Sequence, residues 1–331
     1  MDDDSGRWAK LSPLRAIVAV VLGCLAGVVL VAAPYAFARY GPVSLEQYSA
    51  FSATAGISLT ILLPFVQGFV LALTLGPKRY HPLATAALVG ALVLIQFIGA
   101  AAFLHEGVIC LIILSLPLIT FVALGAVAGR WLARIRSTSA RKSVQVSLLP
   151  LVVLAVVGEA SGPRPDHEAA VTDSIVIAAP PEYVWRYVVQ YPENTSAPEY
   201  WLWRLGLPAP VQSVAQAPRV GAARSCRFSD GVAFEERITE LTPNQSMTFE
   251  VTKQPDHPEV TGHFRFDRGR IALTRTADGA TKITATSWYR LQVRPGFYFD
   301  WWTADITRQV HFRVLNHMKR LAERDYAAAH N

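Results

Sequence analysis

Long uncharged stretches fill the first half of the chain, whereas apolar and polar positions alternate in the second half. Four of the uncharged stretches cover residues 16–38, 53–75, 83–104 and 107–129. Each can cross ~30 Å of bilayer hydrocarbon as a helix, because about 20 residues suffice. The pattern therefore predicts an α-helical transmembrane bundle over residues 1–159.

A fifth stretch, residues 143–159, allows two interpretations. Only 16 uncharged residues separate Lys142 from Glu159, and Pro150 interrupts them. One interpretation is a short span, accommodated by snorkelling of Arg141 and Lys142 and by local thinning of the bilayer. The other is an interfacial or buried helix. The sequence thus predicts four or five spans.

The basic residues of the first half indicate its orientation. Ten of its 11 Lys and Arg lie before the first stretch, between the second and third, or after the fourth. Because cytoplasmic loops are enriched in Lys and Arg, we expect a multi-pass protein of the cell membrane with a cytoplasmic amino terminus. Five spans then place the second half outside the cytoplasm, and four place it inside. We predict five, because residues 144–158 hold no charge and ten Leu and Val.

Little chemistry is expected inside the spans. Gln67 and Gln96 are the main side-chain amides, and no ionisable residue falls at mid-span. Transporters and pumps usually carry ionisable groups at depth, so an anchor or packing role is favoured. A transporter stays open as an alternative, because Pro34, Pro64 and Pro117 could free helix backbone for a ligand.

The second half begins with a proline-rich linker at residues 160–169, and we assign residues 170–331 to one water-soluble domain. A strand is predicted over residues 171–178. Pro180 and Pro181 favour the first turn of a helix, and a second short helix is predicted over residues 198–205.

From residue 222 to residue 293 the pattern is that of an antiparallel meander. Six runs with period-2 alternation follow one another: ARSCRFS, VAFEERITEL, SMTFEVTKQ, GHFRFD, RIALTRT and ATKITATSWYRLQV. A long helix is predicted over residues 300–328, with an apolar stripe at Trp302, Ile306, Val310, Val314, Met318 and Leu321. That stripe needs a partner, and the sheet is the one available.

This element order resembles the helix-grip fold of the START/Bet v 1-like (SRPBCC) superfamily, which includes polyketide cyclase/dehydrase-like proteins. The resemblance lies in IVIAAPPEYVWRYV at residues 175–188, the hairpin RFSDGVAFEERITEL, and TSWYRLQV before the last helix. It implies an α+β domain whose antiparallel sheet curves round the carboxy-terminal helix and encloses an apolar cavity. It also implies a lipid, a polyketide or another hydrophobic molecule as ligand.

The first hairpin of the meander supplies candidate cavity residues. A three-residue loop at Asp230-Gly231 would pair Phe228 with Phe234, so that both side chains enter the core. Cys226 then opposes Glu236, Arg224 opposes Ile238, and all lie on the inner face. Buried charges are expensive unless they are paired. Arg224 and Glu236 therefore indicate either a wet cavity with a polar ligand group, or strand curvature that brings both to the rim.

The last strand supplies further candidates. One face is shared by Ile283, Ala285, Ser287, Tyr289 and Leu291, and it lies opposite Ile271 and Leu273 if the Asp278-Gly279 turn also has three residues. Tyr289 either binds a ligand or is satisfied by backbone. The aromatic cluster Phe297, Tyr298, Phe299, Trp301 and Trp302 either packs the core or forms a cavity mouth at the headgroup level.

Composition and motifs narrow the function. The net charge of +6 belongs mostly to the apolar half, so nucleic acid is a poor partner. The three cysteines offer no disulfide framework, and no zinc spacing occurs. His311 and His317 lie about 240° apart on a helix and cannot share a metal, so we expect solvated or core histidines. We expect no metal, no cofactor and no Ser-His-acid constellation.

Three hypotheses remain. The first is a membrane-anchored domain that binds a hydrophobic small molecule or lipid in an internal cavity, with the bilayer as its second partner. The second is a cyclase or dehydratase, which would use Arg224, Glu236 and Tyr289. The third is a structural or signalling protein that binds a protein partner through an exposed apolar patch.

Overall fold

The computed structural model describes residues 9–25, 56–78, 80–99, 101–102, 107–137 and 168–330, with isolated positions between residues 139 and 159. The chain divides into two compact units, Met1–Arg164 and Pro165–Asn331. This division falls between residues 160 and 169, which were predicted to form the linker; residues 160–167 lie outside the described residues. Residues 168 and 169 belong to the first strand instead.

Among its described residues, the first unit contains three helices that are long and apolar enough to cross a membrane: Ser58–Leu75, Pro82–Gly99 and Val108–Ile135. They correspond to the second, third and fourth predicted spans. A shorter apolar helix, Pro13–Leu25, covers the start of the first predicted span. The rest of that span, and most of residues 143–159, lie outside the described residues.

Two of these helices depart from their predicted form. The first begins as a π-helix, η1 (Ser58–Leu62), and continues as α3 (Leu63–Leu75). Pro64 has no N–H to donate at this junction, and such interruptions loosen the regular helical pattern. Helix α5 (Val108–Ile135) continues past its predicted end at residue 129. Arg130 and Arg134 end the apolar stretch, but neither is a helix breaker.

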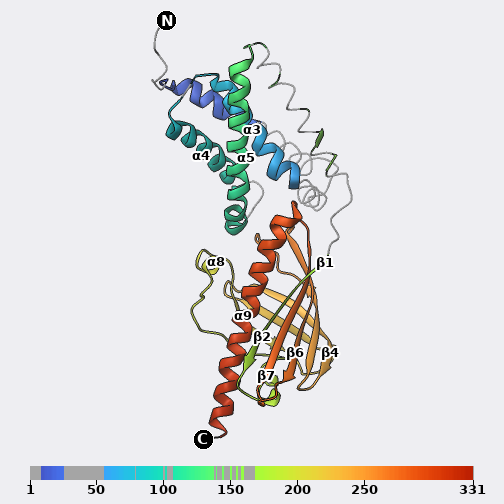
Figure 1. Ribbon diagram of the computed structural model, residues 1–331. Helices are drawn as coiled ribbons and strands as arrows, with labels where there is room; N and C mark the ends of the chain where they lie inside the picture. Colours follow the sequence, from blue (N-terminus) through green and yellow to red (C-terminus); the bar gives the residue numbers. More distant parts are fainter. Residues whose placement is uncertain are drawn as a thin grey trace. The chain divides into compact units, whose positions relative to one another are not determined.

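Helices α3 and α5 are in close contact, and Figure 1 shows the blue ribbon of α3 crossing the green ribbon of α5 at an angle. A Cβ atom added to Gly68 would lie 1.9 Å from the Val122 carbonyl oxygen, and one added to Gly125 would lie 1.9 Å from that of Phe65. Gly129 lies in the same way against Phe69. Small residues permit this backbone approach between apolar helices, where packing provides much of the association energy. Helix α4 (Pro82–Gly99) also contacts α5.

The second unit is a seven-stranded antiparallel sheet with three helices. Its strands are β1 (Glu168–Ile177), β2 (Pro210–Ala215), β3 (Ala223–Phe228), β4 (Ala233–Thr242), β5 (Ser246–Lys253), β6 (Phe264–Arg275) and β7 (Thr281–Leu291). The short helices α7 (Pro181–Trp185) and α8 (Trp201–Arg204) lie between β1 and β2, and α9 (Gly296–Ala328) ends the chain. This order confirms the predicted succession of strand, two short helices, meander and long helix.

The sheet curls round α9 (Figure 1). Its strand order is β1-β7-β6-β5-β4-β3-β2, so β1 and β2 are its two edges. Helix α9 contacts both edge strands, and this is possible only if the sheet bends round the helix. The arrangement confirms the helix-grip architecture.

Two strand predictions were wrong. Strand β2 was missed, because PVQSVA is short, opens with proline and mixes polar with apolar residues, as edge strands often do. The runs GHFRFD and RIALTRT form the single strand β6 rather than two strands divided at Arg268-Gly269. A register shift between Phe266 and Arg268 accounts for the break in pattern. Gly269 is needed there because a Cβ would lie 2.4 Å from the Phe249 ring.

The hairpin turns are partly as predicted. Both the β3–β4 and the β6–β7 loops have three residues, with Gly231 at φ 87° and Gly279 at φ 85°. Ile271 and Leu273 pair with Ala285 and Ile283, as expected. The β3–β4 register was wrong by two residues.

In that hairpin Arg224 faces Glu236 and Cys226 faces Phe234. Phe228 donates its N–H to the Val232 carbonyl and does not pair with Phe234. A shift of two residues keeps every side chain on its predicted face.

Candidate functional site: the interior of the carboxy-terminal unit

The buried face of α9 divides the interior of the second unit into two regions. Leu315, Met318 and Ala322 are fully buried and pack into the hydrophobic core, which includes Ile177, Val184, Val188, Ile238, Met247 and Ile283. Nearer the start of the helix, the buried residues are Thr303, Thr307 and His311. The buried residues of α9 are thus polar near its start and mostly apolar towards its end, where His317 is buried beside Leu315 and Met318.

A chain of aromatic rings lines the sheet in the second region. Ring centroids are 5.4 Å apart for Phe228 and Phe234, 5.9 Å for Phe234 and Phe266, and 5.9 Å for Phe266 and Tyr289. Phe264 joins them at 5.2 Å from Phe266. Phe228, Phe264 and Phe266 are only partly buried, although they share the face that the sheet turns inward. We call these five residues the aromatic wall: Phe234 and Tyr289 are buried, and the other three rings keep part of their surface accessible.

Arg224 and Glu236 form a buried ion pair on the neighbouring strands β3 and β4. Their side chains are 4% and 6% exposed, so the inward orientation is correct and the rim interpretation is wrong. Arg224 Nη1 donates to Glu236 Oε2, and its Nε donates to the Val189 carbonyl at 2.9 Å. The guanidinium also lies 4.9 Å from the centre of the Phe249 ring. Burial raises the pKa of Glu236, and the adjacent Arg224 opposes that rise.

Cys226 lies next to this pair on the inner face. Its Sγ is 4.0 Å from the hydroxyl of Tyr191, which is 3% exposed. Burial raises the pKa of the Cys226 thiol to about 12. The thiol is therefore protonated at neutral pH, and Cys226 is a lining residue rather than a nucleophile.

Ser287 and Tyr289 on β7 make hydrogen bonds that the sequence did not predict. The Tyr289 hydroxyl donates to Asp300 Oδ1 at 2.8 Å, so a carboxylate rather than backbone satisfies it. Burial and this carboxylate raise the pKa of Tyr289. Ser287 Oγ lies 2.8 Å from His311 Nε2, and His311 Nδ1 lies 2.8 Å from Asp173 Oδ2.

The expectation of no Ser-His-acid constellation was therefore wrong. The three residues come from β7, α9 and β1, up to 138 positions apart, and only the fold brings them together. His311 is a buried histidine, as one of our interpretations held. His317 is buried too, and its Nε2 bonds the Pro192 carbonyl at 2.9 Å.

The aromatic cluster before α9 does not behave as one unit. Phe297 and Trp301 are 81% and 63% exposed, so they are not core residues. Trp302 is partly buried, and its ring lies 4.8 Å from Trp301 and 6.3 Å from Trp201 of α8. The core interpretation is wrong for Phe297 and Trp301.

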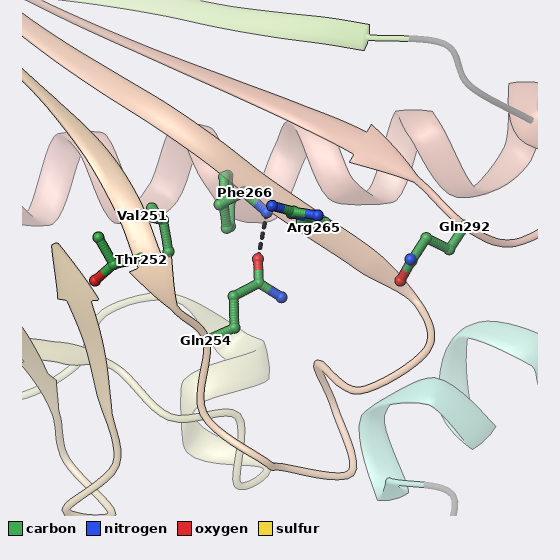
Figure 2. A pocket seen from close by; sticks show the side chains of 6 residues that line it. All are labelled: Val251, Thr252, Gln254, Arg265, Phe266 and Gln292. Atoms are coloured by element: carbon green, nitrogen blue, oxygen red, sulfur yellow. Dashed lines mark hydrogen bonds between the residues drawn. The ribbon is translucent and has the colours of Figure 1, made fainter. Parts of the chain in front are cut away.

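A pocket of about 280 Å³ opens where β5 and β6 separate (Figure 2). The side-chain amide of Gln254 bridges the two strands there: it accepts from the Phe266 N–H and donates to the Phe264 carbonyl at 3.2 Å. The pocket is lined by Val251, Thr252, Gln254, Arg265, Phe266 and Gln292. Phe266 thus belongs both to the aromatic wall and to this opening. Sequence reasoning missed Gln254, because a side chain that replaces a backbone ladder leaves no periodic signal.

Among the described residues, no group of three or more His, Cys, Asp and Glu is placed to hold a metal ion.

The family described as "Polyketide cyclase / dehydrase and lipid transport" matches residues 168–323. With the curled sheet and its carboxy-terminal helix, this match supports an SRPBCC domain in the second unit. A search of curated proteins found no match.

Several solved structures resemble the chain. One is a protein from Chromobacterium violaceum, at 21% identity over 46% of this chain and 96% of that chain, with a TM-score of 0.32. Another is truncated norcoclaurine synthase from Thalictrum flavum, at 11% identity over 48% and 96%, with a TM-score of 0.34. A third is the di-domain ARO/CYC StfQ from the steffimycin biosynthetic pathway, at 17% identity over 56% and 61%, with a TM-score of 0.34.

The buried Arg224–Glu236 pair gives a direct prediction for stability. Glu236→Gln should lower the free energy of unfolding by about 3–5 kcal/mol, because it leaves a buried guanidinium without its counter-charge. The double variant Arg224→Met/Glu236→Leu should lower the free energy of unfolding much less. Urea unfolding of the full chain, followed by tryptophan fluorescence, measures both.

The exposed pair Arg237–Glu250 on β4 and β5 is the matched control. Its side chains are 59% and 47% exposed, so Arg237→Met should change the same free energy by less than about 1 kcal/mol. Equal losses for Glu236→Gln and Arg237→Met would contradict a buried, water-excluded pair.

Proposed function

We propose that the second unit binds a hydrophobic small molecule or lipid in its interior, and that the apolar helices of the first unit hold it at a membrane. The observation that carries the proposal is the aromatic wall. Inward-facing rings that remain partly accessible expose apolar surface to water, and a ligand that covers them gains roughly 25 cal/mol for each Å² removed from water. The family match, whose description includes lipid transport, supports the same class of ligand.

The polar groups of the interior suit a ligand with one polar end. Arg224 and Glu236 lie next to Phe234 on β3 and β4, and Tyr289 lies next to Phe266. A small number of polar groups beside apolar side chains is typical of small-molecule sites. They would orient the ligand, while the rings supply the contact area. The opening between β5 and β6 is a route of entry in this proposal.

The orientation across the membrane is part of the proposal, with the second unit outside the cytoplasm. The contacts of Glu159 support a fifth crossing. Its carboxylate accepts the N–H groups of Ile57 at 2.9 Å and Ser58 at 2.7 Å, at the start of the helix that continues as α3. A carboxylate is favourable at a helix amino terminus.

Residues 136–159 follow α5, and the end of α5 lies far from Glu159. Gly129 of α5 packs against Phe69 and Ala72 of α3, so α5 ends beside the end of α3. Ser58, at the start of the helix Ser58–Leu75, lies about 27 Å from that end at 1.5 Å per residue. The chain from residue 136 to residue 159 therefore connects opposite ends of the α3–α5 pair, which agrees with a fifth span.

Ligand binding is tested with the full chain in lipid nanodiscs and a fluorescent fatty acid that brightens in apolar surroundings. The wild type should bind with a saturable signal. Phe266→Glu should weaken binding at least tenfold, because it places a carboxylate in the apolar lining. Phe297→Glu is the control, since Phe297 is 81% exposed and outside the wall, and it should bind as the wild type does. A non-saturable signal, or equal binding by the two variants, would refute the proposed site.

Topology is tested by labelling single cysteines in a background that lacks Cys24, Cys110 and Cys226. An impermeant maleimide added to intact cells should label Ser161→Cys, and it should label Lys78→Cys only after permeabilisation. The positive-inside rule places the two positions on opposite sides if five segments cross. Protection of Ser161→Cys in intact cells would return the second unit to the cytoplasm.

A further inference from the structure

Ser287, His311 and Asp173 form two consecutive hydrogen bonds inside the second unit. Ser287 lies on β7 and Asp173 on the adjacent edge strand β1, and His311 reaches both from α9. The two bonds are each 2.8 Å, and the His311 and Asp173 side chains are 7% and 8% exposed. Ser287 is partly exposed, although it shares the inward face with Tyr289.

The surroundings fix the roles of the three groups. Burial lowers the pKa of His311, and Asp173 opposes that shift, so the ring is neutral at pH 7. Arg308 Nε donates to Asp173 Oδ1 at 3.3 Å and holds this side chain in place. Asp173 Oδ2 accepts from His311 Nδ1–H, and Nε2 is then left to accept from the Ser287 hydroxyl. A hydroxyl, a base and a group that orients the base are the parts of an activated nucleophile.

Two features of the neighbourhood suit an acyl substrate. Thr307 lies one helical turn before His311 on the same buried face; it is 2% exposed, and its Oγ1 has no hydrogen-bond partner in the part of the chain that the structure describes. A buried, unpaired hydroxyl lacks the compensation that such groups usually find, and it can donate to an oxyanion. Tyr289, two residues from Ser287 on β7, belongs to the aromatic wall and lies next to Phe266. An acyl chain against the wall would reach Ser287 with its carbonyl.

We propose that Ser287 is the nucleophile of an acyl-transfer site that hydrolyses an ester or thioester of a hydrophobic carboxylic acid. The choice of a hydrophobic acid as substrate rests on the function proposed above. The Ser287 oxygen attacks the carbonyl carbon and passes its proton to His311 Nε2, while Thr307 donates to the oxyanion. The tetrahedral species then expels the alkoxide or thiolate, which takes the proton from His311. Asp173 positions the ring throughout.

Water completes the reaction. His311 removes a proton from a water molecule that attacks the acyl-Ser287 ester. The second tetrahedral species releases the carboxylic acid, and Ser287 regains its proton from His311. One ester and one water give one acid and one alcohol, or one thiol for a thioester, with no oxidant or cofactor consumed.

An alkyl fluorophosphonate tests the nucleophile, because it phosphonylates activated serines without requiring turnover. The full chain in nanodiscs should gain one adduct, mapped by peptide mass spectrometry to Ser287. Ser287→Ala should gain none. His311→Gln should slow labelling by about 10²–10⁴-fold, the usual contribution of a general base. Asp173→Asn should slow labelling while fatty-acid binding is kept, a split that a merely structural role would not give.

Thr286→Ala is the matched control. It removes a hydroxyl from the adjacent position on β7, where Thr286 bonds Thr172 on the exposed side of the sheet, and labelling should match the wild type. Absence of an adduct on Ser287, or an equal labelling rate for His311→Gln with an unchanged unfolding temperature, would overturn the inference and leave a hydrogen-bonded tie between helix and sheet.

Fatty-acid binding separates this inference from the proposed function. Saturable binding without labelling refutes only the acyl-transfer site. Labelling of Ser287 by a short-chain fluorophosphonate, without saturable fatty-acid binding, refutes only the hydrophobic-ligand function.

Discussion

The structure of the second unit depends on how α9 buries one face against a sheet that curls round it. Both edge strands contact the helix. Polar groups on its buried face usually find a partner inside, because an unpaired polar group loses its hydration without compensation; the Thr307 hydroxyl, which has no partner among the described residues, is an exception. Leu315, Met318 and Ala322 have apolar side chains that need no hydrogen-bond partner, and they pack in the hydrophobic core. His311 finds Ser287 and Asp173, and Asp300 finds Tyr289. The change from apolar to polar along one helix face therefore separates the filled core from the candidate site.

The buried charges follow the same logic. Arg224 and Glu236 neutralise each other, and the guanidinium has two further contacts, the Val189 carbonyl and the Phe249 ring. Such a pair rarely adds stability over two apolar side chains, because both ions lose their hydration. Stability alone therefore does not explain its presence beside the aromatic wall, and the ligand that we propose would place its polar end there. In the first unit the packing is different, because glycines bring the backbones of α3 and α5 into contact.

Much of this architecture could be predicted from the sequence, because it depends on periodicity. The uncharged stretches, the alternating runs and the stripe on α9 gave the elements and their order, and the parity of the β3–β4 hairpin gave the inward faces of Arg224 and Glu236. The register of the β3–β4 hairpin could not be predicted, because a three-residue loop can begin at either of two neighbouring residues without changing the face on which any side chain lies. That GHFRFD and RIALTRT form the single strand β6 could not be predicted either, because a bulge breaks the alternation of apolar and polar residues that indicates a strand. The contact of Ser287, His311 and Asp173 could not be predicted, since residues from three elements meet only after α9 docks.

Photoaffinity labelling can locate the hydrophobic ligand proposed for the interior beside the aromatic wall. A fatty acid carrying a diazirine on its alkyl chain would be incubated with the full chain in nanodiscs, illuminated, and its adducts mapped by peptide mass spectrometry. We expect adducts on the inward faces of β3, β4 and β6, at or beside Phe228, Phe234 and Phe266, and their loss when excess unlabelled fatty acid competes. Adducts confined to the apolar helices of the first unit, or unaffected by competition, would contradict the proposal.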